Sequence, residues 1–237
     1  MSKKCLLCVI LLFDLAFAQH RSLNYCLDFD GKSADGRIER TVGLQSLNGA
    51  KNYTFEAWVR PRTQGGGGRG RILDQVSSSL TFYLSDEGRI GFRPNREVGW
   101  QLSNPNSIKF WEWQHIAVTS DGKYLRFFVN GKLLTATPSD APLVITKKPI
   151  HVGNGVGEDN STRGFDGWLD DIRVSNVCRW TKEFTPSLRG EDFPPDSTTM
   201  LYLNFDEGPA YDTALDYTTY NAELKIVSPV RRVKDPG

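Results

Sequence analysis

The sequence predicts an all-β protein: an antiparallel β-sandwich of two sheets. Three observations lead to this fold class. Apolar and polar residues alternate with period two in many short segments. Asp121-Gly122 and Asn130-Gly131 lie between such segments, and these dipeptides favour hairpins because they accept positive φ. No stretch keeps the periodicity of a helix. Short strands joined by hairpins pack as two antiparallel layers.

The predicted strands follow one another along most of the chain. A clear alternating run is 54–60, where Phe55, Ala57 and Val59 share one face until Pro61 ends the strand. The full set of predicted strands is 24–30, 54–60, 80–84, 89–92, 115–119, 124–129, 132–135, 150–152, 168–174, 200–205 and 222–227. We expect the run Gly65–Gly68 to form a flexible loop tip between strands.

Residues 1–18 have the pattern of a secretory signal peptide. Lys3 and Lys4 precede the apolar stretch 5–13, and the small residues of Ala16-Phe17-Ala18 mark a cleavage site before Gln19. The apolar stretch is shorter than the roughly 20 residues that span a bilayer. The sequence therefore predicts a secreted protein without a membrane span. Residues 19–237 would form one domain, with a short, solvated basic tail at 231–234.

Net charge limits the classes of molecule that the protein could bind, and the cysteines indicate whether a disulfide could form. The chain carries a formal charge of +1, and residues 1–18 hold two lysines and one aspartate, so the remainder is neutral. A neutral surface excludes electrostatic capture of nucleic acid. Cys5 and Cys8 leave with the signal peptide, and Cys26 and Cys178 stay in an oxidising compartment. We expect these two to form a disulfide, with two separate buried thiols as the alternative.

Five segments, in their order along the chain, resemble laminin-G-like domains of the concanavalin A-like jelly-roll superfamily, to which pentraxins also belong. They are Leu27–Gly31, Tyr53–Pro61, Trp113–Gly131, Gly164–Asn176 and Leu201–Gly208. The resemblance implies a jelly-roll sandwich and a recognition module for sugars or proteins. It also implies that the opening strand and the strand containing 170–174 lie close enough for the disulfide.

Catalysis is the less favoured hypothesis. Sandwich glucanases carry paired carboxylates at alternating positions of one strand, since retaining hydrolysis needs two carboxyls roughly 5 Å apart. This chain has no E-x-D-x-E or E-x-D-x-x-E, and Asp28-Phe29-Asp30 is the nearest approach. Glu56 and His115 fit better as buried, hydrogen-bonded groups. The sequence therefore predicts that the protein is not an enzyme, with a glycoside hydrolase or lyase as a minor alternative.

Two segments have the composition of a ligand site. One contains an aromatic ring beside an amide, and the other is a glycine-rich loop dense in oxygen ligands. The predicted ligand contacts are Trp100, Gln101, Asn154, Glu158, Asp159 and Arg163. Packing of Trp100 between strand and loop is the competing interpretation.

The resemblance also implies calcium in the same loop. Ca²⁺ takes six to eight oxygens, and the predicted metal ligands are Glu158, Asp159 and Asn160. The chain departs from pentraxins at 75–79, which lacks their Asp-Asn pair. Asn52 and Asn160 begin N-glycosylation sequons, and a glycan on Asn160 would compete with metal and ligand.

The sequence therefore favours a secreted, non-catalytic module that binds glycans, assisted by calcium. An extracellular protein–protein adhesion or assembly module is the rival hypothesis. The same fold serves both.

The signal-peptide assignment has a direct test. We expect N-terminal sequencing of secreted material to begin at or within a residue or two of Gln19, because the small-x-small site lies there. Recovery of secreted protein that still begins at Met1 or Ser2 would contradict the assignment.

Overall fold

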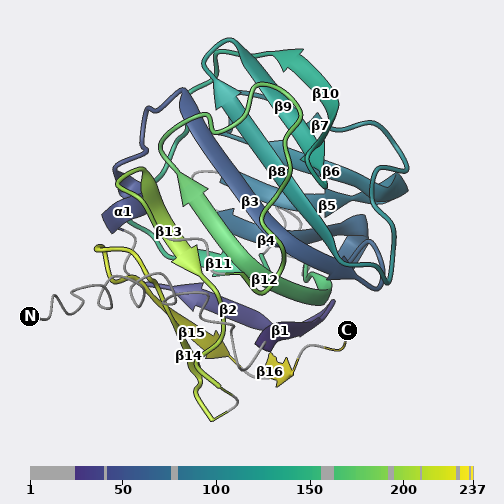
Figure 1. Ribbon diagram of the computed structural model, residues 1–237, viewed down its shortest axis with the longest axis vertical. Helices are drawn as coiled ribbons and strands as arrows, with labels where there is room; N and C mark the ends of the chain where they lie inside the picture. The colour runs from purple at the N-terminus through teal and green to yellow at the C-terminus, as the bar shows by residue number, and fades with distance from the viewer. Residues whose placement is uncertain are drawn as a thin grey trace, which may run out of the picture.

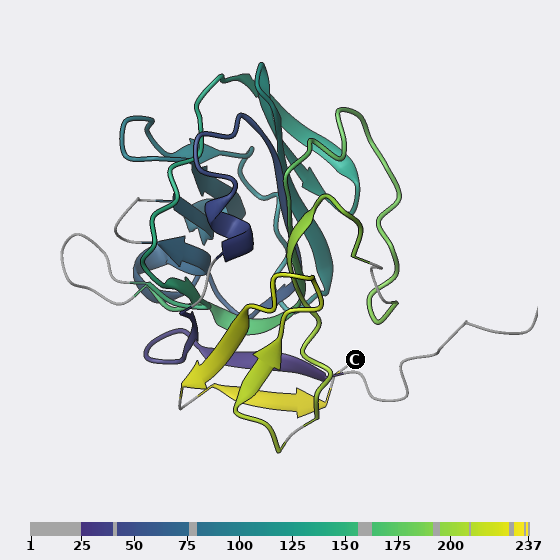
Figure 2. The same ribbon diagram turned by 90° about the vertical axis from the view of Figure 1, so that its left-hand side faces the viewer.

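The computed structural model describes residues 25–39, 42–75, 80–155, 163–191, 195–208, 210–227, 230–234 and 236. These residues form two antiparallel sheets that pack face to face (Figures 1 and 2). The predicted all-β sandwich is confirmed.

The first sheet contains the long strands of the molecule. Its order is β10 (Lys132–Pro138), β9 (Tyr124–Val129), β8 (Gln114–Asp121), β3 (Asn52–Pro61), β12 (Asp166–Ser175), β1 (Tyr25–Asp30) and β16 (Arg231–Lys234). β13 (Thr199–Leu203) pairs with the second half of β12, on the side of β12 where β1 begins. A bulge in β12 separates the two halves.

The second sheet has the order β14 (Thr213–Leu215), β15 (Glu223–Val227), β2 (Asp35–Ile38), β11 (Ile150–Val152), β4 (Arg69–Gln75), β5 (Leu80–Ser85), β6 (Arg89–Arg93) and β7 (Gln101–Leu102). In the described part of the chain, three short helical turns lie outside the sheets: α1 (Val42–Gln45) and the 3₁₀ turns η1 (Gly66–Gly68) and η2 (Asp86–Gly88).

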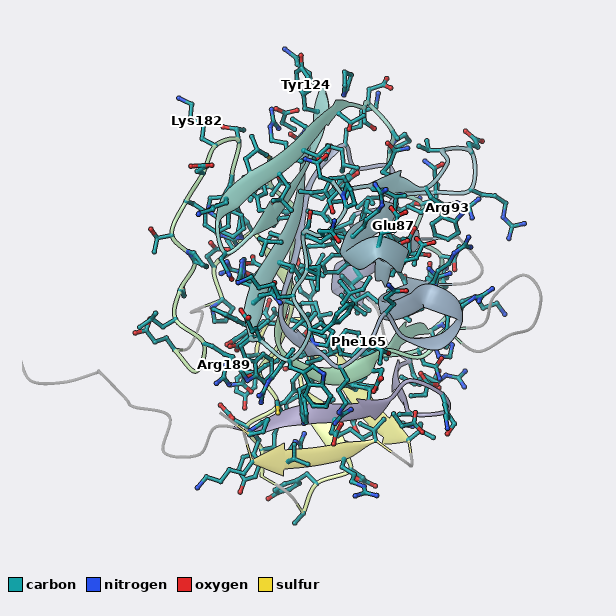
Figure 3. The ribbon with its side chains drawn as sticks, turned by 90° about the vertical axis from the view of Figure 1, so that its right-hand side faces the viewer. Glu87, Arg93, Tyr124, Phe165, Lys182 and Arg189 are labelled. Atoms are coloured by element: carbon teal, nitrogen blue, oxygen red, sulfur yellow. The ribbon has the colours of Figure 1, made fainter. Side chains whose placement is uncertain are left out.

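Aromatic rings fill the space between the sheets. Phe55 of the first sheet lies 5.1 Å, centroid to centroid, from Phe92 of the second and 6.4 Å from Phe82. Phe165 also lies between the layers, as its label in Figure 3 shows, and meets Phe29 edge to face. Edge-to-face pairs add about 0.5–1.5 kcal/mol each beyond their buried area. The alternation predicted for 54–60 therefore points Phe55 into this core.

The outer face of the first sheet is covered by a segment that we call the strap, residues 176–191. Figure 3 shows two of its side chains, Lys182 and Arg189, on the flank opposite to Arg93. Trp180 and Phe184 stack with ring centroids 3.7 Å apart, and both meet His115 edge to face. The strap shields this face from water.

A buried ion network lies under the strap. The carboxylate of Glu56 (β3) accepts a hydrogen bond from Arg173 Nε (β12) at 2.7 Å and lies 3.0 Å from His115 Nε2 (β8). Burial alone raises the pKa of Glu56, but the His115 hydrogen bond and the Arg173 charge outweigh it and hold this pKa below its ordinary value. The interpretation of Glu56 and His115 as structural groups is confirmed.

The run Gly65–Gly68 lies between β3 and β4 as expected, and Gly66 N–H donates to the Gly164 carbonyl at 2.8 Å. One local expectation is wrong. The tail 231–234 is not solvated, because it forms β16 on β1 and buries Arg232. The Arg232 guanidinium donates to Glu207 Oε2 at 2.8 Å and to three backbone carbonyls. Sequence composition could not reveal a strand that depends on a partner about 200 residues away.

The structure contains no disulfide between Cys26 and Cys178, which contradicts the expected bridge. β1 pairs with the first half of β12, where Leu27 faces Leu169. Cys178 follows the far end of β12, and its thiol lies 3.4 Å from the Trp180 carbonyl. A strand rises about 3.3 Å per residue, so several residues of β12 exceed the roughly 7 Å limit between bridged Cα atoms.

Among the described residues, no helix has the length and apolar character needed to cross a bilayer.

We expect Glu56→Gln to lower the free energy of unfolding by about 3–5 kcal/mol at pH 7, because it leaves Arg173 buried without its charged partner. A lowered pKa in the folded state means that this stabilisation is present above the ordinary carboxyl value of 4.5 and is lost as the pH falls through the folded value. The difference between wild type and variant should therefore shrink in acid. Urea unfolding at pH 7 and pH 3 measures it, with the exposed Glu97→Gln as control. Equal differences at both pH values would contradict the expectation.

Candidate functional site

The outer face of the second sheet carries charged and aromatic side chains. Phe82 and Leu84 of β5 point into the core, so Tyr83 between them points outward. Its neighbours in register are Arg71 on β4 and Gly91 on β6. The Tyr83 ring lies directly across Gly91, where a Cβ would collide with it. The missing side chain of Gly91 therefore lets the ring lie flat on the sheet.

Trp100 packs onto Tyr83 from the segment that leads into β7. The two rings meet edge to face with centroids 5.2 Å apart. Three guanidinium groups surround the indole, with their Cζ atoms at 4.7 Å (Arg93), 5.1 Å (Arg71) and 5.5 Å (Arg69) from its centroid. We call Arg69, Arg71, Arg93, Tyr83 and Trp100 the arginine–aromatic cluster. Its rings orient the arginines through cation–π contacts.

Arg71 is the buried member of this cluster, with only 5% of its surface exposed. Its Nε lies 3.5 Å from Asp74 Oδ1, too far for a strong hydrogen bond. Nε and Nη1 are both enclosed and have no hydrogen-bond partner in the described part of the chain. Burial lowers the pKa of Arg71, yet a guanidinium stays charged in proteins. The cluster therefore holds a cation with unused donors, which is costly unless something accepts them.

Asp74 balances only part of this charge. Its Oδ1 accepts the Thr81 hydroxyl at 2.8 Å, and burial raises the pKa of its carboxyl against the effect of Arg71. Gly155, at the foot of the 154–163 loop, packs directly on Asp74 Oδ2. Asp74 therefore offsets part of the charge of Arg71, and the Asp86 carboxylate lies near enough to act on Tyr83.

The same loop returns to the cluster at Arg163. The Arg71 N–H donates to the Arg163 carbonyl at 2.9 Å, and the Arg163 N–H donates to the Gly155 carbonyl at 3.0 Å. The Arg163 side chain occupies the space above Gly67, where a Cβ would collide with it. Arg163 adds positive charge close enough to depress the pKa of Arg71 further. The described ends of the loop, at Gly155 and Arg163, therefore lie next to Asp74 and Arg71.

His151 extends the positive face on β11, opposite Asp74 in register. Its Nδ1 lies 3.0 Å from both carboxylate oxygens of Asp35, and this hydrogen bond raises the pKa of the imidazole. His151 therefore keeps a proton more readily than a free histidine does.

The other predicted ligand contacts do not all lie in the cluster. Gln101 pairs with Phe92 and donates to the Gly99 carbonyl at 3.1 Å, so it remains at the margin. Asn154 is buried and accepts the Gly155 N–H at 2.8 Å, which shapes the loop rather than presenting an amide to a ligand. Glu158, Asp159 and Asn160, including the calcium ligands, lie outside the described residues. No set of three His, Cys, Asp or Glu side chains suited to a metal occurs in the described ranges.

Sequence reasoning missed the arginines of the site. β4 was not among the predicted strands, because its apolar residues are few and a bulge interrupts its alternation. Arg93 follows the predicted strand 89–92 by one residue. The usable signal was the spacing of Arg69 and Arg71, which an alternating strand places on one face.

The carboxylates that approached a glucanase motif all have structural partners. Asp28 forms an ion pair with Arg62. Asp30 accepts three consecutive backbone N–H groups, from Lys32, Ser33 and Ala34, at 2.9 Å each. Each of these carboxylates therefore fixes a side chain or a turn.

Several solved structures share this fold. A candidate carbohydrate-binding protein from Bacteroides ovatus superimposes with a TM-score of 0.70 at 15% identity, over 91% of this chain and 61% of that one. The chain thus spans less than two thirds of that protein. A heptameric pentraxin from Limulus polyphemus gives 0.51 at 16% identity over 67% and 78%. The extracellular region of zebrafish Gpr126/Adgrg6 gives 0.53 at 10% identity over 90% and 26%.

No curated protein matches the sequence. The Laminin_G_3 family profile, described as the concanavalin A-like lectin/glucanases superfamily, matches residues 32–183, well over half of the chain. The chain therefore belongs to the Laminin_G_3 family of concanavalin A-like domains.

Proposed function

We propose that this protein is a secreted, non-catalytic binding module whose arginine–aromatic cluster takes an acidic glycan. The observation that carries the proposal is the convergence of three guanidiniums on Trp100, with Arg71 buried beneath the more exposed Arg69 and Arg93. A buried charge is normally paired, because an unpaired one costs several kcal/mol. A carboxylate or sulfate on a sugar supplies acceptor oxygens in the planar arrangement that a guanidinium matches.

The surroundings of Arg71 favour an anion over a neutral sugar. Arg69, Arg93 and Arg163 place further positive charge nearby. The arginines occupy the space around the indole of Trp100, so this ring serves to hold them. The sugar would enter as a charged group that the arginines contact, with its ring against the outer edge of the cluster.

The non-catalytic part of the proposal rests on the roles of the carboxylates. Asp28, Asp30 and Glu56 hold Arg62, a turn and the buried ion network. Glycoside hydrolysis needs two carboxyls free to flank the scissile bond. The candidate carbohydrate-binding protein of the same fold agrees with a role in glycan recognition.

Secretion and calcium are part of the proposal. The signal-peptide pattern at 1–18 and the sequons at Asn52 and Asn160 support an extracellular location. Asn52 lies exposed at the start of β3, where a glycan has room. Calcium would bind in the 154–163 loop beside the cluster, and chelation provides its test.

Binding of three hexasaccharides to the full chain, measured by calorimetry, tests the proposal. Heparin hexasaccharide carries sulfates and carboxylates, hyaluronan hexasaccharide carries carboxylates alone, and cellohexaose is neutral. We expect at least one acidic probe to bind and Arg71→Gln to weaken it tenfold or more, about 1.4 kcal/mol. Affinity should fall with added salt, since charges at the margin are screened. A calcium requirement would appear as loss of affinity in EDTA.

The matched control is Arg231→Gln, which removes one exposed arginine from β16 on the first sheet. Arg71→Lys keeps the charge but loses the bidentate fork, so it should weaken binding less than Arg71→Gln. Thermal melts establish that the variants are folded. Absence of binding to both acidic probes, or affinity that Arg71→Gln leaves unchanged, would contradict the proposal and favour the protein-adhesion alternative.

A further inference from the structure

A second aromatic feature lies on the other sheet, away from the arginine–aromatic cluster. Trp111 belongs to the turn that precedes β8, and 56% of its surface is exposed. Its backbone φ is +65°, a value that bulky side chains rarely adopt. Conformations of this kind persist only where the surrounding structure imposes them, and they concentrate at functional sites.

Two hydrogen bonds from β3 impose this conformation. The Trp111 N–H donates to the Pro61 carbonyl at 2.7 Å, and the Trp111 carbonyl accepts from Arg60 Nε at 2.9 Å. A glycine would satisfy both bonds without strain. The backbone geometry therefore does not explain why a tryptophan stands here, and its ring gains little burial.

The ring of Trp111 forms one wall of an open corner. Trp168 on β12 meets it at 61°, with the centroids 6.0 Å apart. The guanidinium carbon of Arg62 lies 3.9 Å from the Trp168 centroid, and its nitrogens contact Asp28, Asp166 and the Phe29 carbonyl. Trp168 is therefore fixed in place.

Arg60 lies beside the corner, and only part of its hydrogen-bonding capacity is used there. Its Cζ is 5.1 Å from the Trp168 centroid, and its Nε is used by the Trp111 carbonyl. Its two terminal nitrogens make no hydrogen bond within the described part of the chain. A flat apolar ring thus lies exposed next to free N–H donors.

From this corner we infer a second ligand site, in which the ring of Trp111 stacks on a neutral hexopyranose. The C–H groups on one face of a pyranose cover an indole, and its hydroxyls accept hydrogen bonds from Arg60. A neutral sugar fits because the two carboxylates nearby, Asp28 and Asp166, offset the two positive charges of Arg62 and Arg60.

The size of the patch argues against a protein partner. Apart from Trp111, the turn exposes Phe110 at 37%, and an ion pair between Lys109 and Glu112 at 3.3 Å flanks it. These two charged side chains are 70% and 59% exposed. A stable protein interface buries about 800 Å² on each partner with a larger apolar centre. One sugar ring matches this corner better.

Binding of cellohexaose, mannohexaose and maltohexaose to the full chain, followed by calorimetry and tryptophan fluorescence, tests the inference. We expect at least one of these neutral probes to bind. Trp111→Ala should weaken it tenfold or more, and Trp111→Tyr should keep most of the affinity because a flat ring remains. Tyr211→Ala removes an equally exposed aromatic elsewhere and should have no effect.

Trp111→Gly separates a binding role from a structural one. Glycine relieves the positive φ, so the variant should lose binding while its Tm stays equal or rises. Arg71→Gln should leave the neutral probes unaffected, and Trp111→Ala should leave acidic probes unaffected, so the two sites succeed or fail separately. The inference is overturned if none of the neutral probes binds, if Trp111→Ala keeps full affinity, or if Trp111→Gly lowers the Tm as a core substitution does.

Discussion

The buried carboxylate of Glu56 is the constraint on which the first sheet depends. It receives Arg173 from one neighbouring strand and His115 from the other, so a single side chain ties β8, β3 and β12 together. A slip of one residue in either pairing would turn the partners to the opposite face and leave the charges unmatched. The network therefore fixes register as well as stability.

The strap strengthens the Glu56 ion network because it shelters the network from water. Its stacked Trp180 and Phe184 cover His115, and the Thr119 hydroxyl donates to the Trp180 carbonyl at 2.8 Å. An ion pair sheltered from water is stronger than one on the surface, but it is tolerated only when its hydrogen bonds are made. The strap also covers the part of the first sheet's outer face around His115. The outer face of the second sheet carries the arginines.

Local sequence signals predicted most of the first sheet. Asp121-Gly122 and Asn130-Gly131 define two hairpins, and the alternation of 54–60 identifies its core face correctly. Among the strands that escaped prediction, β14 is short, β4 is bulged, and β16 depends on β1, about 200 residues earlier in the chain. Long-range strand pairing also explains why the predicted disulfide between Cys26 and Cys178 is absent. Their types and compartment suggested a bridge, but the bulged length of β12 keeps them apart.

In the candidate site too, one part was predictable from the sequence and another part was not. Trp100 was visible in the sequence as an aromatic residue in a polar segment. Its arginines were not, because the pairing of β4 with β5 and of β5 with β6 brings Arg71 and Arg93 to it. Register across three strands cannot be deduced from composition. The positive φ of Trp111 likewise depends on Pro61 and Arg60, some fifty residues earlier.

The return of β16 to β1 has a consequence for architecture. Tyr25 and Lys234 face each other in register, so the first and last described strands leave the sandwich from one corner (Figure 2). A unit whose ends meet can be placed within a loop of a larger polypeptide, or strung between other units, with little distortion of its host. Such a unit is joined to its host through a single corner of the sandwich.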